Sequence, residues 1–257
     1  MSARVTVLRG RTSDRSADGV RGAQALGEEL AARLGVAPVL VGEPGAPREA
    51  RWEADLRDGR DAIAAAGLAL GAALDAGDMP VLLASDCTIC MSSLPALARR
   101  EPAARVVWLD AHGDFNTPGT TASGYLGGMC LAAACGRWDG GFGPGIDPAR
   151  VVLSDARDLE AGERDELGAA GVAILAPARV PDAVRGERVF VHVDLDVLDP
   201  SEMPFSFPAA GGLPLPALRA LLAELAGAAE IAGVEVTSTA SPGAAGRLAD
   251  MLQPLIP

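Results

Sequence analysis

Eight short runs of β-branched and apolar residues recur along the chain, and stretches rich in Ala, Leu and Glu separate several of them. The runs are Val5–Leu8, Val39–Val41, Val81–Ala84, Val106–Leu109, Val151–Ser154, Val172–Leu175, Val189–Val193 and Gly233–Val236. The stretches typical of helices are Ala23–Leu34, Asp61–Asp75, Leu126–Cys135, Glu160–Ala170, Leu215–Ala228 and Ala244–Leu255. Strands that alternate with helices predict βαβ units and a parallel sheet covered on both faces. We therefore expect a single α/β domain over residues 1–257.

Side chains that bind metals follow two of these runs at alternate positions. They are Asp110, His112 and Asp114 after the fourth run, and Asp194 and Asp196 after the seventh. Alternate residues of an extended chain project to one side, and ligands of parallel sheets bind beyond the carboxyl ends of the strands. Four carboxylates and one imidazole that meet there would be unfavourable unless cations neutralise them. The pattern predicts a two-metal site, and such sites usually activate water.

Composition narrows the class of protein. A chain of 257 residues with 49% hydrophobic residues can bury a large core, which argues against disorder. The net charge of −12 argues against nucleic acid or an anionic membrane surface as the partner. We find no apolar run of about 18 residues, the length that a membrane span needs. A charged segment followed by an apolar one, as in signal peptides, is also missing, so we expect a cytoplasmic protein.

The chain resembles the ureohydrolase family, which comprises arginase, agmatinase and formimidoylglutamase. The resemblance rests on DAHGDFN at 110–116, HVDLDVLDP at 192–200, GVEVT at 233–237 and ASDCT at 84–88. It implies a three-layer αβα fold with an eight-stranded parallel sheet and a binuclear manganese centre. It also leaves a homo-oligomer open, because members of the family are commonly trimers or hexamers.

The same resemblance assigns six ligands to two Mn²⁺ ions, with two carboxylates bridging. One ion would be held by Cys87, Asp110, Asp114 and Asp194, and the other by His112, Asp110, Asp194 and Asp196. Cys87 departs from the commoner histidine and resembles the branch that hydrolyses Nω-hydroxyarginine in D-cycloserine biosynthesis. A thiolate is softer than imidazole, so other divalent ions stay open. The alternative is a buried thiol outside the ligand set.

Substrate residues are also implied by position. Glu235 matches a family glutamate and would pair with a planar guanidinium through two hydrogen bonds. Asn116, Thr121 and Ser123 match positions that hold an α-carboxylate, and Glu160 matches an acid that holds the α-amino group. The alternatives are an arginine partner or solvent for Glu235, and ordinary turn or capping roles for the others.

Further positions bear on the mechanism. Arginases usually carry a histidine that shuttles protons where this chain has Gly127. We predict that Asp114 accepts the proton of water and passes it to the leaving nitrogen. His192 shares the parity of Asp194, which makes it either a third ligand of that strand or a supporting residue beneath it. The Pro- and Gly-rich stretch Pro204–Pro216 is long for a compact domain, which is typical of a functional loop.

The four cysteines allow other readings. Cys87 and Cys90 form a CxxC pair, which a redox motif or a four-cysteine zinc site would use. Cys130 and Cys135 are five apart in a helical stretch and would point in different directions, which counts against the zinc site. We expect Cys90, Cys130 and Cys135 to be core thiols.

Together these observations predict a binuclear metal-dependent amidinohydrolase acting on a small amino-acid-like substrate. The substrate that fits best is a guanidino or N-hydroxyguanidino amino acid such as Nω-hydroxy-L-arginine, in specialised metabolism. One alternative is a deacylase-type hydrolase of amides or hydrazides on the same scaffold. Another is a catalytically inactive homologue that only binds metal.

Overall fold

The computed structural model describes residues 2–239 and 241–257, which fold around one parallel sheet. The strands are β1 Ala3–Leu8, β2 Val39–Val41, β3 Met79–Leu83, β4 Arg105–Asp110, β5 Val151–Asp155, β6 Ala173–Leu175, β7 Arg188–Asp194 and β8 Glu230–Thr237. The helices are α1 Ala17–Leu34, α2 Trp52–Asp75, α3 Cys90–Arg100, α4 Cys130–Ala134, α5 Glu163–Ala170, α6 Val180–Ala183, α7 Leu215–Ala228 and α8 Ala245–Leu252.

The eight strands have the order β2-β1-β3-β8-β7-β4-β5-β6, and all neighbours are parallel. Each of the eight predicted runs overlaps one of these strands, with Ala84 and Val172 just outside them, so the predicted sheet is confirmed. β8, β7 and β4 lie side by side in the middle of the sheet. All strands end at the same edge because they are parallel, and this edge therefore gathers residues that are far apart in the sequence.

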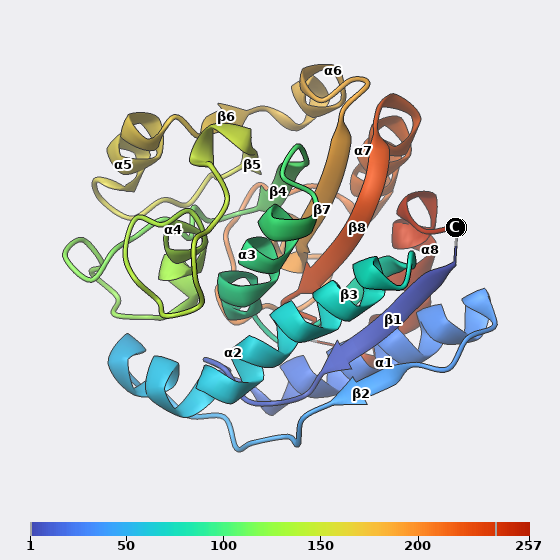
Figure 1. Cartoon of the computed structure of the whole chain (residues 1–257), viewed down its shortest axis with the longest axis horizontal. Coiled ribbons are helices and arrows are strands. Elements are labelled where there is room, and N and C mark those ends of the chain that lie inside the picture. The colour runs from blue at the N-terminus through green and yellow to red at the C-terminus, as the bar shows by residue number, and fades with distance from the viewer. Residues whose placement is uncertain (1, 240) are drawn as a thin grey trace.

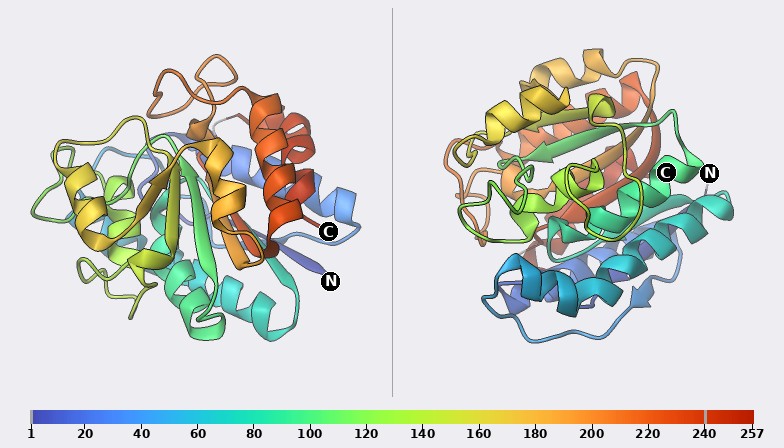
Figure 2. Two further views of the ribbon diagram at one scale, coloured as in Figure 1. Left: turned by 90° about the horizontal axis from the view of Figure 1, so that it is seen from above. Right: turned by 60° about the vertical axis from the view of Figure 1, so that its left-hand side comes forward.

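Helices cover both faces of the sheet, which confirms the three-layer αβα arrangement (Figures 1 and 2). One core packs α1, α7 and α8 against the sheet, with residues such as Leu30, Leu222 and Leu252 buried. The other core packs α2, α3 and α4, with residues such as Leu70 and Leu94 fully buried. A fully buried Leu side chain contributes about 2 kcal/mol.

One long helix was not predicted. α3 contains three residues of low helix propensity, Ser92, Ser93 and Pro95, within an apolar segment. It forms because its face is buried against α2: the hydroxyl of Ser92 accepts a hydrogen bond from the backbone N–H of Gly67 at 2.8 Å. Tertiary packing outweighs intrinsic propensity here. The helix matters for function because the turn just before it carries Cys87.

Among the described residues, no helix is long and apolar enough to cross a membrane.

Candidate metal centre

The predicted ligands begin at the last residues of β4 and β7. Asp110 ends β4, and its Oδ1 accepts a hydrogen bond from the backbone N–H of His112 at 2.7 Å. Asp194 ends β7 and makes the same bond with the backbone N–H of Asp196 at 2.8 Å. A short acid that binds the backbone two residues ahead bends the chain into a tight turn. Both strands therefore stop at their first ligand.

The extended spacing used to group the ligands is corrected by these turns. His112 and Asp114 lie beyond the end of β4, and Asp114 adopts a left-handed backbone with φ of 52°. Asp196 lies in a 3₁₀ turn. The side chains still converge, but the tight turns bring them together rather than a continued strand.

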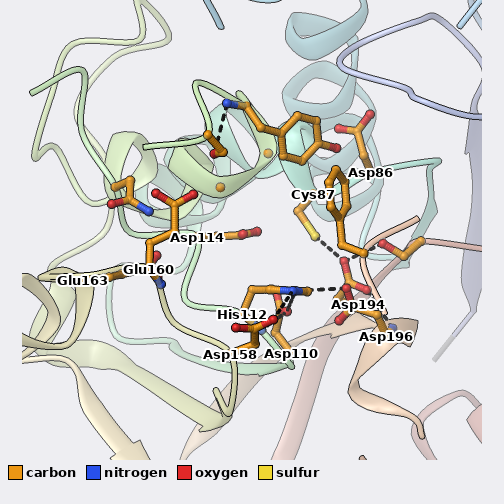
Figure 3. A pocket seen from close by; sticks show the side chains of 17 residues that line it. Asp86, Cys87, Asp110, His112, Asp114, Asp158, Glu160, Glu163, Asp194 and Asp196 are labelled. Atoms are coloured by element: carbon orange, nitrogen blue, oxygen red, sulfur yellow. Dashed lines mark hydrogen bonds and ion pairs between the residues drawn. The ribbon is translucent and has the colours of Figure 1, made fainter. Parts of the chain in front are cut away.

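A cavity of about 120 Å³ lies at this edge, and all six predicted ligands line it: Cys87, Asp110, His112, Asp114, Asp194 and Asp196 (Figure 3). Five of them are at most 7% exposed, and His112 is half-buried. Oxygen and nitrogen ligands thus meet in a pocket that largely excludes water, where unpaired charge is costly.

The buried carboxylates repel one another, and burial and neighbouring charges shift the pKa values of the predicted ligands. Burial lowers the pKa of His112, but Asp110 and Asp196 outweigh it and raise the pKa to about 12. Burial raises the pKa of Asp110, but the contacts with His112 lower it overall. For Asp114 and Asp196, burial and then neighbouring carboxylates raise the pKa well above its usual range. The imidazolium alone does not neutralise the cluster, and divalent cations would.

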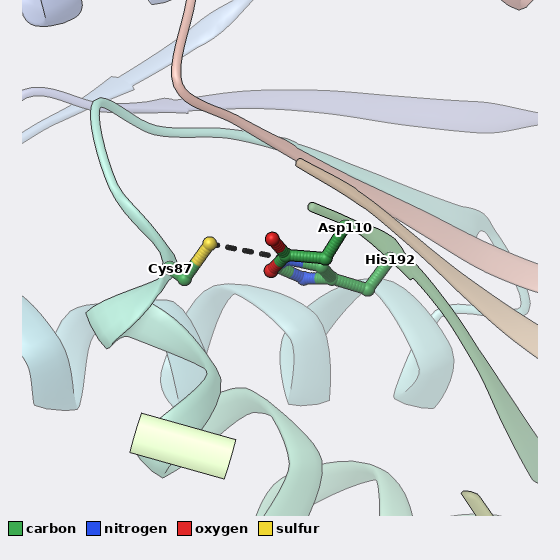
Figure 4. Close-up of side chains that lie close together, drawn as sticks. All are labelled: Cys87, Asp110 and His192. Carbon is green, nitrogen blue, oxygen red and sulfur yellow. Dashed lines mark hydrogen bonds between the residues drawn. The ribbon is translucent and has the colours of Figure 1, made fainter. Parts of the chain in front are cut away.

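Cys87 lies against the ligands of β7. Its Sγ is 2.7 Å from Asp194 Oδ2, to which it donates, and 3.3 Å from His192 Nε2. Figure 4 shows the sulfur facing Asp110 and His192 across the sheet edge. Burial, followed by the charge of Asp194, raises the pKa of the thiol well above its usual value. A cation beside the sulfur would reverse this, because metal binding deprotonates a thiol.

Two groups of side chains bring their donor atoms within 4.8 Å of one another. They are Cys87, Asp110 and His192, and Asp110, His112 and Asp196. Asp110 belongs to both groups, and neither group contains Asp114 or Asp194. A hard carboxylate majority with one imidazole and one thiol fits first-row divalent ions.

Glu235 is the residue predicted to contact a guanidinium. It is fully buried, its Oε2 accepts a hydrogen bond from Ser93 Oγ at 2.6 Å, and its Oε1 lies 2.9 Å from His192 Nδ1. It is not among the residues that line the cavity. In this structure Glu235 contacts Ser93 and His192, and its predicted contact with a guanidinium stays a prediction.

His192 is accordingly a supporting residue. Its ring stacks on Trp108 with centroids 3.5 Å apart and planes at 7°, and it does not line the cavity. Because Nδ1 is engaged by Glu235, Nε2 faces Cys87. Such supporting contacts fix the orientation of metal ligands.

Three of the four predicted residues for the amino-acid end, Asn116, Ser123 and Glu160, line the cavity. Glu160 Oε2 also accepts a hydrogen bond from the backbone N–H of Ala122 at 2.8 Å, which ties it to the Ser123 loop. Thr121 does not line the cavity. Its hydroxyl accepts a hydrogen bond from the backbone N–H of Gly124 at 2.9 Å, as in an ordinary turn, and its predicted contact with an α-carboxylate stays a prediction.

Sequence reasoning missed seven further residues of the cavity wall, namely Asp86, Tyr125, Gly128, Asp158, Glu163, Phe207 and Ser238. Asp86 is adjacent to Cys87 and Asp158 lies two residues before Glu160, so closeness in sequence to a predicted residue was an available signal. Phe207 comes from the long loop expected to be functional, and its ring lies 4.7 Å from that of Tyr125. Tyr125 and Ser238 carried no signal in one sequence.

Gly127 is explained by Tyr125. A Cβ at position 127 would lie 2.3 Å from Tyr125 Cε1 and 2.9 Å from its hydroxyl oxygen. The phenol ring thus occupies the space next to Gly127 that any side chain there would enter. The residue at 127 cannot move protons, since it has no side chain.

Comparison with known proteins identifies the family to which this chain belongs. Residues 53–246 match the sequence profile of the arginase family. The chain belongs to the arginase family. Members of this family are metal-dependent ureohydrolases that cleave C–N bonds of amidines and guanidines, and this chain is an enzyme of that class.

Individual relatives agree with this assignment. The chain is 37% identical over 241 residues to an Nω-hydroxy-L-arginine amidinohydrolase of Streptomyces lavendulae, covering 92% of this chain and 88% of the relative. It is 36% identical over 177 residues to the arginase of Bacillus caldovelox, 59% of each chain. The crystal structure of the latter matches with a TM-score of 0.79 at 26% identity, over 98% of both chains. The predicted family and the arginase-like fold are therefore confirmed.

Proposed function

We propose that this chain hydrolyses a C–N bond of an N-hydroxyguanidino amino acid, Nω-hydroxy-L-arginine or a close relative. The products would be the amine of the amino acid and hydroxyurea. The similarity to the Streptomyces lavendulae amidinohydrolase over nearly the whole chain supports this substrate. We also propose that the protein acts in the cytoplasm, in specialised metabolism, and that it assembles as a homo-oligomer. Both statements rest on the family resemblance described above.

The proposal includes two divalent ions, with Mn²⁺ the first candidate. Cys87, Asp110, Asp114 and Asp194 would hold one, and Asp110, His112, Asp194 and Asp196 the other. When bound, such a pair lowers the pKa of water and stabilises negative charge that develops on the substrate. The raised pKa of the buried thiol and carboxylates supports this ligand set, because the groups fit together as anions only beside cations.

The side chains of this chain would bind the substrate and move its protons. Asn116, Ser123 and Glu160 would hold the carboxylate and amino groups of the amino acid. Asp114 would take the proton of the attacking water at a carboxylate oxygen and hand it to the leaving nitrogen. Phe207, 40% exposed and edge-on to the ring of His112 at 6.4 Å, would shield the reacting group from water.

The observation that carries the choice of substrate is the pairing of Gly127 with Tyr125. The space beside the glycine is filled by a phenol ring, so position 127 offers no imidazole to shuttle protons. An N-hydroxyguanidine is less basic than a guanidine, so its hydrolysis needs less help from an acid. A site without that shuttle favours the less basic substrate.

Turnover of metal-loaded protein tests the proposal. Nω-hydroxy-L-arginine, L-arginine, agmatine and an acyl-lysine should be incubated separately, with hydroxyurea, urea and acetate measured. We expect hydroxyurea from the first at a kcat/KM well above that for any other. Asp110→Ala and Asp194→Ala should abolish both metal uptake and turnover, while Asp182→Ala, exposed on α6, should change neither.

Three results would contradict the proposal. Acetate release would favour a deacylase, and inertness on every amidino compound would favour a homologue that only binds metal. Activity retained in Asp110→Ala would contradict the bridging role.

A further inference from the structure

Arg157 is a largely buried arginine at the carboxyl edge of the sheet, two residues beyond the end of β5. Its side chain is 14% exposed and forms an ion pair with Asp155, the last residue of that strand. The next residue, Asp158, lines the metal cavity, and its backbone N–H donates to the carbonyl of Ala111 at 2.9 Å. Arg157 does not itself line the cavity, so its guanidinium group contacts the protein and not a bound substrate.

The guanidinium group binds the Asp196 turn, residues 195–198, which follows β7. Nη2 donates to the carbonyl oxygens of Asp196 at 2.8 Å and Leu198 at 3.3 Å, and Nη1 donates to that of Val197 at 3.3 Å. All three residues are buried, and buried carbonyl oxygens need hydrogen-bond donors. Arg157 therefore supports the backbone that carries Asp196, one of the six predicted metal ligands.

The same guanidinium group also binds the Phe207 loop, residues 199–213. Nη2 lies 2.9 Å from the carbonyl oxygen of Ala209, and Nε lies 3.3 Å from the same oxygen and 3.2 Å from that of Ala210. Ala209 is buried and lies two residues after Phe207, which lines the metal cavity. One side chain thus joins the turn of a predicted metal ligand to the segment that carries an aromatic wall residue.

Backbone hydrogen bonds close the ends of the Phe207 loop without help from Arg157. The N–H of Asp199 donates to the carbonyl of Leu213 at 2.9 Å, and the N–H of Leu213 donates to the carbonyl of Val197 at 3.0 Å. These bonds hold the two ends together, whereas the bonds from Arg157 hold the segment just after Phe207. The guanidinium group is planar and rigid, so it restricts the two segments that it binds to one relative arrangement.

We propose that Arg157 is a positioning residue that fixes the Asp196 turn and the Phe207 loop relative to each other, and that metal affinity depends on it. The inference rests on the proposed function where that function assigns Asp196 to a metal ion. Arg157 acts through Asp196 and Phe207 and touches no substrate. Contacts that orient a metal ligand from behind change metal affinity by about ten- to a hundredfold when they are removed.

Two variants remove these contacts to different extents. Arg157→Met keeps an apolar stem and removes all of the N–H donors. Arg157→Lys keeps a positive charge near Asp155, but its donors sit on one atom and cannot span both segments. The matched control is Arg105→Met, because Arg105 begins β4 at the opposite edge of the sheet and its Nη1 donates to the carbonyl of Ala183 at 3.0 Å. Both arginines bind backbone carbonyls, but Arg105 does so a strand's length from the metal cavity.

Hydrogen exchange of the full-length protein in saturating Mn²⁺, and calorimetric Mn²⁺ titration after chelation, are the two measurements. Exchange is followed at the amides of Asp196 and Leu198 in the turn and Leu213 in the loop, which donate hydrogen bonds at 2.8, 3.1 and 3.0 Å. In both Arg157 variants we expect at least about tenfold faster exchange at all three amides and at least about tenfold weaker Mn²⁺ binding. In Arg105→Met both quantities should stay within about twofold of wild type, even where its Tm falls as far.

Wild-type exchange in either segment, unchanged Mn²⁺ affinity, or equal changes in Arg105→Met would overturn the inference. Wild-type behaviour of Arg157→Lys would overturn it too, because a charge alone would then suffice. Arg157→Lys carries the same comparison should Arg157→Met not fold. If wild type takes up no Mn²⁺, the proposed metal centre fails, and hydrogen exchange alone decides whether Arg157 holds the turn and the loop together.

Discussion

The raised pKa of Asp14 predicts how the stability of the protein against unfolding depends on pH. Burial, followed by the negative charge of Asp86, raises the pKa of Asp14 to about 7 in the folded protein, against a reference value of 3.8. Below pH 3.8 the carboxyl is protonated in both states and costs nothing. As the pH rises towards 7 the unfolded state releases its proton first, so the unfolded state is favoured and the protein loses stability. Above pH 7 the loss is constant.

The size of the effect follows from the two pKa values. Each pH unit between them is worth about 1.4 kcal/mol, which bounds the full effect at about 4 kcal/mol. Between pH 5 and pH 8, where the protein is convenient to handle, about 3 kcal/mol of this should appear. Asp14→Asn has no proton to release there, so its free energy of unfolding relative to wild type should rise by about that amount over this range.

Urea unfolding of wild type and Asp14→Asn at pH 5, 6, 7 and 8 measures the difference directly. Using the difference between the two proteins cancels the titration of the shared metal ligands. Asp61→Asn, exposed on α2, reports what the loss of one surface carboxylate does. A difference between wild type and Asp14→Asn that stays constant within about 0.5 kcal/mol across the range would refute the reasoning.

Three other outcomes follow from the site. Chelation should lower the Tm and Mn²⁺ should restore it, because the buried acids lose their cations; an unchanged Tm would count against metal binding. Gly127→Ala should lower kcat/KM about tenfold because the new methyl group displaces the ring of Tyr125. Tyr125→Ala removes that ring, so the double variant should lose less kcat/KM than the two single variants together, and additive losses would contradict the contact. Glu235→Ala removes the buried partner of His192, so it should lower the free energy of unfolding in urea by about 3 kcal/mol and weaken metal binding at least tenfold in a metal titration. A selective rise in KM at unchanged stability would instead support the predicted contact of Glu235 with a guanidinium.

The sheet could be predicted from the sequence because its strands are buried on both faces. Continuous runs such as Val106–Leu109 and Val189–Val193 stand out against the flanking Gly, Pro and charged residues. α3 was missed for the opposite reason. Its serines and proline are poor helix formers, and only the contact with α2 explains why the segment is helical.

The metal ligands could be predicted because acids and imidazole rarely follow apolar strands without a function. The side chains facing them could not, since Tyr125 and Ser238 belong to loops whose paths depend on the folded protein. Ser238 adopts a left-handed backbone with φ of 57° just after β8, a conformation that its own sequence does not signal.

The contacts of Glu235 follow from its depth in the sheet. Asp110 and Asp194 are the last residues of β4 and β7, and they reach the cavity. Glu235 lies two residues before the end of β8, which at about 3.3 Å per residue puts it about 7 Å below the edge. His192 lies at the same depth in β7 and pairs in register with Glu235, so the two side chains meet in the layer beneath the ligands. In this sheet, therefore, the distance of an acid from the end of its strand decides whether its side chain lines the cavity or packs in the layer beneath it.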